Sequence, residues 1–460
     1  MNKDNKNIKE NKSTIDILEE SIDGKTHLIV NMGPSHPSMH GIIKIILELE
    51  GELVVNADLE IGYLHRGFEK TCEHRTWNGV IPYTDRLNYC SPIINNVGYV
   101  LAVEKLIGID VPERCKYIRV IMCEIARIAD HLTCIGAAAM ELGAFTVFLY
   151  AMKAREYLYA LLEDVSGARV TNAFARVGGI KADLSATFSE KTKEAILKVK
   201  EAIKETHQLL TGNRIFIDRM KGTGVISAED AIAWGFTGPC LRSTGVNYDV
   251  RKAYPYLIYK ELNFDIPIGE NGDNYDRYLV RMEEMVQSIR IIEQALQKTP
   301  SGPINSEGFE YEPSQIIEMA KKGLVPEDKE KIKIILANTL DGASKNRLAE
   351  ITTDNKNIFL PPKEEVYSNI EALMQHFKLI MHGHGIKPPE GEVYFPVEGA
   401  NGEVGFYLVS TSSDKPYRIH VRAPCFPILS ALPLMIKGYM VADVIPTFGS
   451  INMIGGELDR

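Results

Sequence analysis

The sequence predicts an α+β protein in which a central helical bundle carries small antiparallel β layers from the N-terminal and C-terminal regions. Long segments with apolar residues at helical spacing fill the middle of the 460-residue chain. Runs rich in β-branched and aromatic residues lie near both ends, at 27–60 and 392–423. Several long helices in succession make a bundle the expected main core.

The same patterns divide the chain into five regions. We expect a flexible N-terminal tail at 1–26, an N-terminal β layer at 27–65, a helical bundle core at 66–298, a surface insertion at 299–361 rich in Lys, Glu, Asn and Pro, and a C-terminal α/β region at 362–460 that completes the core.

Composition excludes several classes of protein. With 45% hydrophobic and 25% charged residues the chain is typical of globular proteins, and a net charge of −9 without a local Lys/Arg cluster argues against nucleic-acid binding. None of its seven cysteines forms a CxxC pair, which favours free thiols and argues against a zinc or iron–sulfur site held by this chain alone. The polar N-terminus resembles neither a signal peptide nor a transit peptide.

Residues 31–41, NMGPSHPSMHG, stand out because two histidines, two prolines and two glycines share one short stretch between two β-branched runs. Proline fixes φ and glycine tolerates unusual dihedral angles, so a stiff hairpin turn is expected. His36 and His40 either present their imidazoles to a ligand or are satisfied by backbone carbonyls, and the pattern alone leaves both open.

The poorly periodic segment that follows predicts a surface covered by a partner or a ligand. Cationic and aromatic side chains crowd it, among them His65, Arg66, His74, Arg75 and Arg86.

Helical spacing then dominates. It predicts helices at 93–107, 112–135, 145–165, 190–211, 274–298 and 364–381. In the second of these, one face is polar, and we expect that face to be solvated or to contact a partner; it carries Arg119, Glu124, Arg127 and Asp130.

Residues 134–152 are apolar apart from Glu141 and are about long enough to cross a bilayer. Gly136 and Gly143 interrupt the stretch, so we favour two helix ends that meet near Gly143. A carboxylate in such a run either handles protons or pairs within the core, and both readings stay open for Glu141.

Other candidate groups carry weaker signals. His382 and His384 could bind a metal, but no carboxylate stands at a familiar offset, which favours a loop. Tyr89, between Arg86 and the next helix, either donates a proton or only packs.

Several separated motifs occur in an order that closely resembles the 49 kDa-type (D-type) subunit family of NADH-quinone oxidoreductase, respiratory complex I. They are GPSHPSMHG, IGYLHRGFEK, EHRT, YTDRLNY, GVNYDVRKAYPY and the terminal Asp-Arg. The resemblance runs from about residue 28 to 298 and from about 362 to 460.

This family is similar to the large subunits of nickel–iron hydrogenases, so the resemblance implies a hydrogenase large-subunit-like fold. Those subunits bind metals through two CxxC pairs. The corresponding stretches, 86–91 and 454–460, have no such pair. The resemblance therefore implies a lost metal site and a remaining cavity.

For the site, the resemblance implies that this chain and a B-type subunit enclose a quinone, the substrate, while the B-type subunit holds a four-iron, four-sulfur cluster. His40 and Tyr89 would flank the quinone carbonyls, with His36 also lining the site and Glu141 paired with His40. Arg66 and Arg86 would lie toward the cluster.

The chain departs from the family pattern at several positions. Glu141 stands where Asp is usual, and Thr171 where many members have His. Ser35 and Met39 replace the more frequent Gln and Thr, and the stretch at 300–360 is longer than usual. These differences bear on tuning of the site.

The resemblance further implies a subunit of the peripheral arm of a proton-translocating NADH:quinone oxidoreductase, on the cytoplasmic side of a bacterial inner membrane. Its expected partners are the B-type and C-type subunits and the membrane-arm H-type subunit. The alternatives are a membrane-bound hydrogenase large subunit and a non-catalytic assembly scaffold.

Overall fold

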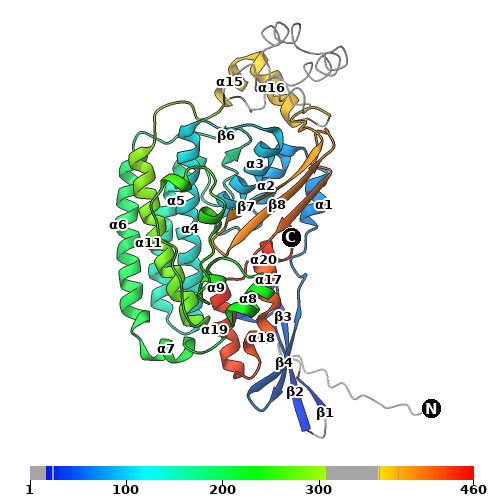
Figure 1. Ribbon diagram of the computed structural model, residues 1–460, viewed down its shortest axis with the longest axis vertical. Helices are drawn as coiled ribbons and strands as arrows, with labels where there is room; N and C mark the ends of the chain where they lie inside the picture. The colour runs from blue at the N-terminus through cyan, green and yellow to red at the C-terminus, as the bar shows by residue number, and fades with distance from the viewer. Residues whose placement is uncertain (1–16, 23–24, 307–360, 362, 382) are drawn as a thin grey trace, which may run out of the picture.

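A computed structural model describes residues 17–22, 25–306, 361, 363–381 and 383–460 (Figure 1). Its largest part is a bundle of long helices that lie side by side: α4 (Glu113–Glu141), α5 (Phe145–Ser166), α6 (Phe188–Thr206) and α11 (Asn274–Lys298). Each has apolar residues recurring at helical spacing, so the bundle buries a continuous core. The predicted α+β class is confirmed.

The N-terminal sheet projects from the lower end of the molecule in Figure 1. Its antiparallel strands follow chain order: β1 (Ile17–Ile22), β2 (Lys25–Met32), β3 (Lys44–Glu50) and β4 (Leu53–Glu60). Alternate residues of β3 are buried, as expected for a sheet with one covered face. Strand β1 lies inside the range 1–26, and its pairing with β2 corrects the predicted extent of the flexible tail.

The C-terminal sheet has the three predicted strands: β7 (Gly391–Glu398), β8 (Glu403–Ser410) and β9 (Arg418–Arg422). It packs against α3 (Pro92–Ile107). At the contact, a Cβ on Gly98 would lie 2.7 Å from the side chain of Val397 and 3.0 Å from that of Phe406, so only glycine allows this close approach.

Shorter elements complete the described residues. They are η1 (Pro37–Met39), α1 (Phe68–Glu73), α2 (Trp77–Thr84), β5 (Ala175–Arg176), β6 (Gly179–Ile180), η2 (His207–Thr211), α7 (Arg214–Met220), α8 (Ala228–Ala233), α9 (Gly238–Arg242), α10 (Val250–Ala253), η3 (Tyr259–Glu261), α15 (Lys363–Ser368), α16 (Ile370–Ile380), α17 (Cys425–Ser430), α18 (Leu432–Ile436), α19 (Val441–Ile451) and α20 (Gly455–Leu458).

The helix predicted at 364–381 is two helices, α15 and α16, separated at Asn369. Of the insertion predicted at 299–361, residues 307–360 lie outside the described residues, as does His382. His384 is described and is exposed.

The polar face of α4 is neither solvated nor free for a partner, which corrects the sequence interpretation. Arg119, Glu124, Arg127 and Asp130 are fully buried. Arg119 donates to both carboxylate oxygens of Glu104 at 2.7 and 2.8 Å, and Glu124 accepts from the Tyr259 hydroxyl at 2.7 Å. Burial of such charges is tolerated because each one is paired within the chain.

The apolar stretch at 134–152 contains the end of α4 and the start of α5, as predicted. The break lies at residues 142–144, where Gly143 has φ +86°, whereas α4 continues through Gly136, contrary to the expectation of a break there. Among the helices of the described ranges, none combines the length and apolar character that crossing a membrane requires.

Candidate functional site

The turn between β2 and β3 is as stiff as its sequence predicts. Gly33 has φ +95°, and a Cβ there would lie 2.3 Å from the carbonyl oxygen of Ile43, so no other residue fits. Met39 is fully buried and fixes the turn to the core, while His40 follows it in the left-handed region at φ +54°. The turn therefore points the His40 side chain, 49% exposed, away from the core.

His36 has a local role in the same turn. Its Nδ1 accepts a hydrogen bond from the backbone N–H of Ser38 at 3.2 Å and caps η1. One ring nitrogen is thus held by a backbone N–H, and not by a carbonyl as the sequence alternative supposed. The half-buried ring keeps Nε2 for a further contact.

His40 meets Glu141, the last residue of α4. The distance from His40 Nε2 to Glu141 Oε1 is 3.7 Å. The second oxygen, Oε2, is buried and has no hydrogen-bond partner among the described residues, and a Cβ on Gly449 would lie 2.7 Å from it. Burial raises the pKa of Glu141 to about 7 and lowers the pKa of His40 from its usual value, so burial disfavours the charged form of both groups.

Tyr89 lies in the turn that joins α2 to α3. Its side chain is 41% exposed. Partial burial, with the nearby Cys90 thiol, raises the pKa of Tyr89 to about 12, so the hydroxyl keeps its proton at neutral pH and can donate it in a hydrogen bond. The turn is held from below by Asp130 of α4, which accepts from Asn88 Nδ2 at 2.8 Å.

Arg66 and Arg86 lie together beside this turn. Arg66 Nη2 donates to the carbonyl oxygen of Arg86 at 2.8 Å, and Arg86 Nη1 donates to that of Pro82 at 2.5 Å. Both arginines line a surface pocket of about 450 Å³ with Phe68 and Tyr83. Arg66 has no close carboxylate partner among the described residues. Two cationic side chains on an open pocket would therefore favour binding of an electron-rich group of another molecule.

Thr171 lies near the same region of the fold, in a loop after α5. It adopts φ +53°, and the next residue but one, Ala173, donates its backbone N–H to Asp85 at 2.9 Å. Threonine cannot titrate, so any protonation equilibrium at this position is absent.

Sequence reasoning missed the part that Asp130 plays in the site, and also Asn452 and Glu457. The C-terminal segment brings Asn452 to 3.0 Å from Asp130 and places Glu457 fully buried, with one oxygen unpartnered. Burial raises the pKa of Glu457 to about 7. The sequence pattern places Asp130 on the polar face of its helix and gives no sign of this cluster, because the partners of Asp130 lie far away in the sequence.

No three His, Cys, Asp or Glu side chains gather in a metal-binding arrangement anywhere in the described ranges. The candidate residues are an imidazole and a carboxyl group 3.7 Å apart, a phenol in the turn between α2 and α3, and two arginines beside that turn. Groups of these kinds can hold and deliver protons.

Comparison with known proteins identifies the family. The model of the family described as "Respiratory-chain NADH dehydrogenase, 49 Kd subunit" matches residues 141–460. The chain belongs to this family.

Curated relatives, all D-type subunits of NADH-quinone oxidoreductase by name, extend the similarity over almost the whole chain. One of two such subunits of Sorangium cellulosum is 49% identical over 434 residues, covering 94% of this chain and 95% of the relative. That of Pelobacter propionicus is 46% identical over 443 residues, covering 96% and 98%. A combined C/D-type subunit of Bdellovibrio bacteriovorus is 45% identical over 434 residues, covering 94% and 69%.

Proposed function

We propose that this chain is the subunit of a proton-translocating NADH:quinone oxidoreductase that forms, with a B-type subunit, the site of quinone reduction. The observation that carries the proposal is the approach of His40 to Glu141 on a rigid turn, since it places an imidazole and a carboxyl group of near-neutral pKa where a ligand can reach them. The names and coverage of the curated relatives support the same assignment.

The chemistry requires two electrons and two protons for each quinone reduced to quinol. His40 and Tyr89 would hydrogen-bond the two carbonyl oxygens as negative charge develops there, and would supply the protons. Glu141 would return a proton to His40, and His36 would line the site through its remaining ring nitrogen. The exposure of the Tyr89 side chain, 41%, supports this role, because it leaves the ring open to a ligand.

Arg66 and Arg86 would face the four-iron, four-sulfur cluster held by the B-type subunit. Fixed positive charge beside a cluster stabilises its reduced form, and the open pocket that both arginines line leaves room for a partner surface. Electrons would reach that cluster from NADH through other subunits, so this chain would bind no cofactor alone.

The remaining partners in the proposal are the C-type subunit and the membrane-arm H-type subunit. The combined C/D-type relative supports the first, because two proteins joined in one chain must lie within reach of each other. The H-type subunit would attach the complex to the cytoplasmic side of a bacterial inner membrane.

The test is NADH-driven quinone reduction in membranes that carry His40→Ala or Tyr89→Phe. We expect each variant to lose at least about a hundredfold in rate, the low end of what one acid–base group contributes. NADH reduction of ferricyanide, which takes electrons upstream, should stay at the wild-type level and so serves as the control for assembly. Wild-type quinone reduction in both variants would rule out the assignment.

Two alternatives give different outcomes. A hydrogenase large-subunit homologue would contain nickel, which metal analysis of the purified complex detects. An assembly scaffold would keep both activities when His40 is replaced, and would bind no quinone-site inhibitor.

A further inference from the structure

Asp130 is a fully buried carboxylate near the middle of α4, one of the longest helices described. Its Oδ2 accepts from Asn88 Nδ2 at 2.8 Å and from the Ser91 hydroxyl at 2.7 Å. Its Oδ1 accepts from Asn452 Nδ2 at 3.0 Å. Three donors satisfy a buried carboxylate, so this side chain has a single favoured orientation.

Two of the three donors flank Tyr89 in the turn between α2 and α3. The Asn88 side chain also acts on the turn from within, since its Oδ1 accepts from the backbone N–H of Cys90 at 3.1 Å and of Ser91 at 3.4 Å. Asp130 holds the Asn88 side chain, and Asn88 holds the backbone that follows Tyr89. Hydrogen bonds therefore connect α4, a rigid helix, to the turn whose central exposed side chain is Tyr89.

Tyr89 itself depends on this support. Its ring is 41% exposed, so core packing restrains only part of it, and the position of its hydroxyl follows from the conformation of the turn. A displacement of about 1 Å in a group that must meet a reacting atom can cost a hundredfold in rate.

We propose that Asp130 is a positioning residue for quinone reduction, which fixes the Tyr89 hydroxyl by anchoring both ends of its turn through Asn88 and Ser91. This inference rests on the proposed function. Asp130 lies beneath the turn and does not touch the quinone; it acts through hydrogen bonds to the turn, and its charge is not required for that action.

The two substitutions Asp130→Ala and Asp130→Asn distinguish an effect of the hydrogen bonds that Asp130 accepts from an effect of its charge. Alanine removes the acceptor for both turn donors. Asparagine keeps one oxygen, which can accept from Asn88 and Ser91. Its Nδ2 would face the Nδ2 of Asn452, which stays bound to Asn401 Oδ1, so the contact with Asn452 is lost while the two contacts with the turn remain. Asparagine thus retains the anchor while it removes the charge.

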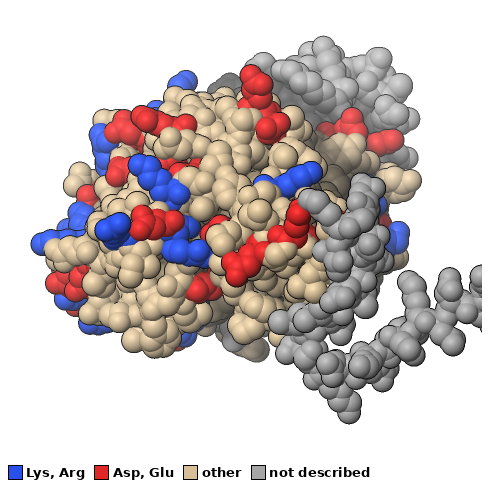
Figure 2. Space-filling view, turned by 90° about the horizontal axis from the view of Figure 1, so that it is seen from below, with Lys and Arg blue, Asp and Glu red and all other residues tan. Residues whose placement is uncertain are grey.

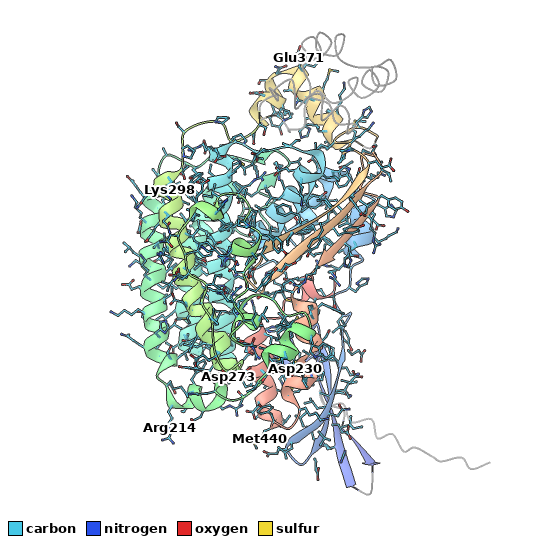
Figure 3. The ribbon with its side chains drawn as sticks, in the orientation of Figure 1. Arg214, Asp230, Asp273, Lys298, Glu371 and Met440 are labelled. Atoms are coloured by element: carbon cyan, nitrogen blue, oxygen red, sulfur yellow. The ribbon has the colours of Figure 1, made fainter. Side chains whose placement is uncertain are left out.

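The experiment measures kcat and KM for NADH-driven reduction of a short-chain quinone analogue in membranes, with ferricyanide reduction as the assembly control. We expect Asp130→Ala to lower kcat/KM at least about tenfold and Asp130→Asn to stay within about twofold of wild type. Asp273→Ala is the matched control, because Asp273 is a buried carboxylate at the lower end of α11 (Figure 3) that accepts hydrogen bonds from the backbone N–H groups of Gly222 and Asp276 and from none of the turn that carries Tyr89 among the described residues. It should leave kcat/KM unchanged in the assembled enzyme.

A double substitution tests whether Asp130 acts through Tyr89. If it does, adding Asp130→Ala to Tyr89→Phe lowers kcat/KM no further than Tyr89→Phe alone. Losses that multiply would overturn the inference, as would equal impairment of the alanine and asparagine variants, or a normal alanine variant. Normal kinetics of Tyr89→Phe alone would also overturn the inference, whereas normal kinetics of both Tyr89→Phe and His40→Ala would refute the proposed function, so the two failures can be told apart.

Discussion

The pKa of Glu141 makes a quantitative prediction about stability. A carboxyl group whose pKa rises from 4.5 in the unfolded chain to about 7 in the folded protein binds its proton more tightly when folded. The folded state is therefore destabilised, relative to a residue that cannot ionise, as the pH rises above 4.5, and the penalty is complete above about pH 7. Glu141→Gln removes the penalty because glutamine stays neutral.

The expected size follows from the shift. With about 1.4 kcal/mol for each pKa unit, the penalty is about 1.4 kcal/mol at pH 5.5 and about 3.4 kcal/mol at pH 8.5. The free energy of unfolding of Glu141→Gln, compared with that of the wild type, should therefore rise by about 2 kcal/mol between these two pH values. Packing changes caused by the substitution do not depend on pH and cancel in this comparison.

The assay is denaturant unfolding of the purified chain at pH 5.5 and pH 8.5, for both proteins. A stability difference between variant and wild type that stays constant within about 0.5 kcal/mol would refute the reasoning, because it would mean that Glu141 has an ordinary pKa. Repeating the pair in a His40→Ala background controls for the imidazole 3.7 Å away.

Three further predictions concern the framework of the site. Gly33→Ala should destabilise the protein by several kcal/mol, because its Cβ would lie 2.3 Å from a carbonyl oxygen. Gly41→Ala should cost only about 1–2 kcal/mol, because Gly41 has φ +77° but no atom lies within 4 Å of its Cβ. Thermal unfolding of the two variants compares these costs. Glu104→Ala should cost about 3–5 kcal/mol by leaving Arg119 buried and unpaired, and Glu104→Gln, which keeps one acceptor oxygen, should cost less in denaturant unfolding. All seven thiols are buried, so Ellman's reagent should modify them slowly in the native protein and completely after unfolding; rapid modification under native conditions would contradict the packing.

Much of the fold follows from local sequence signals. The long helices could be predicted because apolar residues recur along them at helical spacing, and the strands because β-branched runs end at turn residues. Residues 31–41 predicted their own stiffness, since glycine and proline act within a few residues. In each case the determining interaction lies close in sequence to the residue that signals it.

The parts that could not be predicted depend on residues that are distant in sequence. The charged face of α4 resembles a solvated face until the partners of its side chains are known, and those come from other elements, as Glu104 and Tyr259 do. The pairing of β1 with β2 was hidden for another reason, because β1 contains acidic residues and lies next to a polar terminus. On the lower face of the molecule, basic and acidic side chains are interspersed, so the described residues of that face form no patch of a single charge sign (Figure 2).

Helix α4 links the two halves of the candidate site. Asp130 and Glu141 are eleven residues apart, which is close to three full turns, so both side chains leave the same face of the helix, about 16 Å apart along its axis. Asp130 anchors the turn that carries Tyr89, and Glu141 meets the turn that carries His40. The distance between the two proposed proton donors is therefore set in part by one continuous, buried helix. The spacing of the two groups that would contact a ligand held between His40 and Tyr89 thus depends on α4 as well as on the stiff turn at residues 31–41.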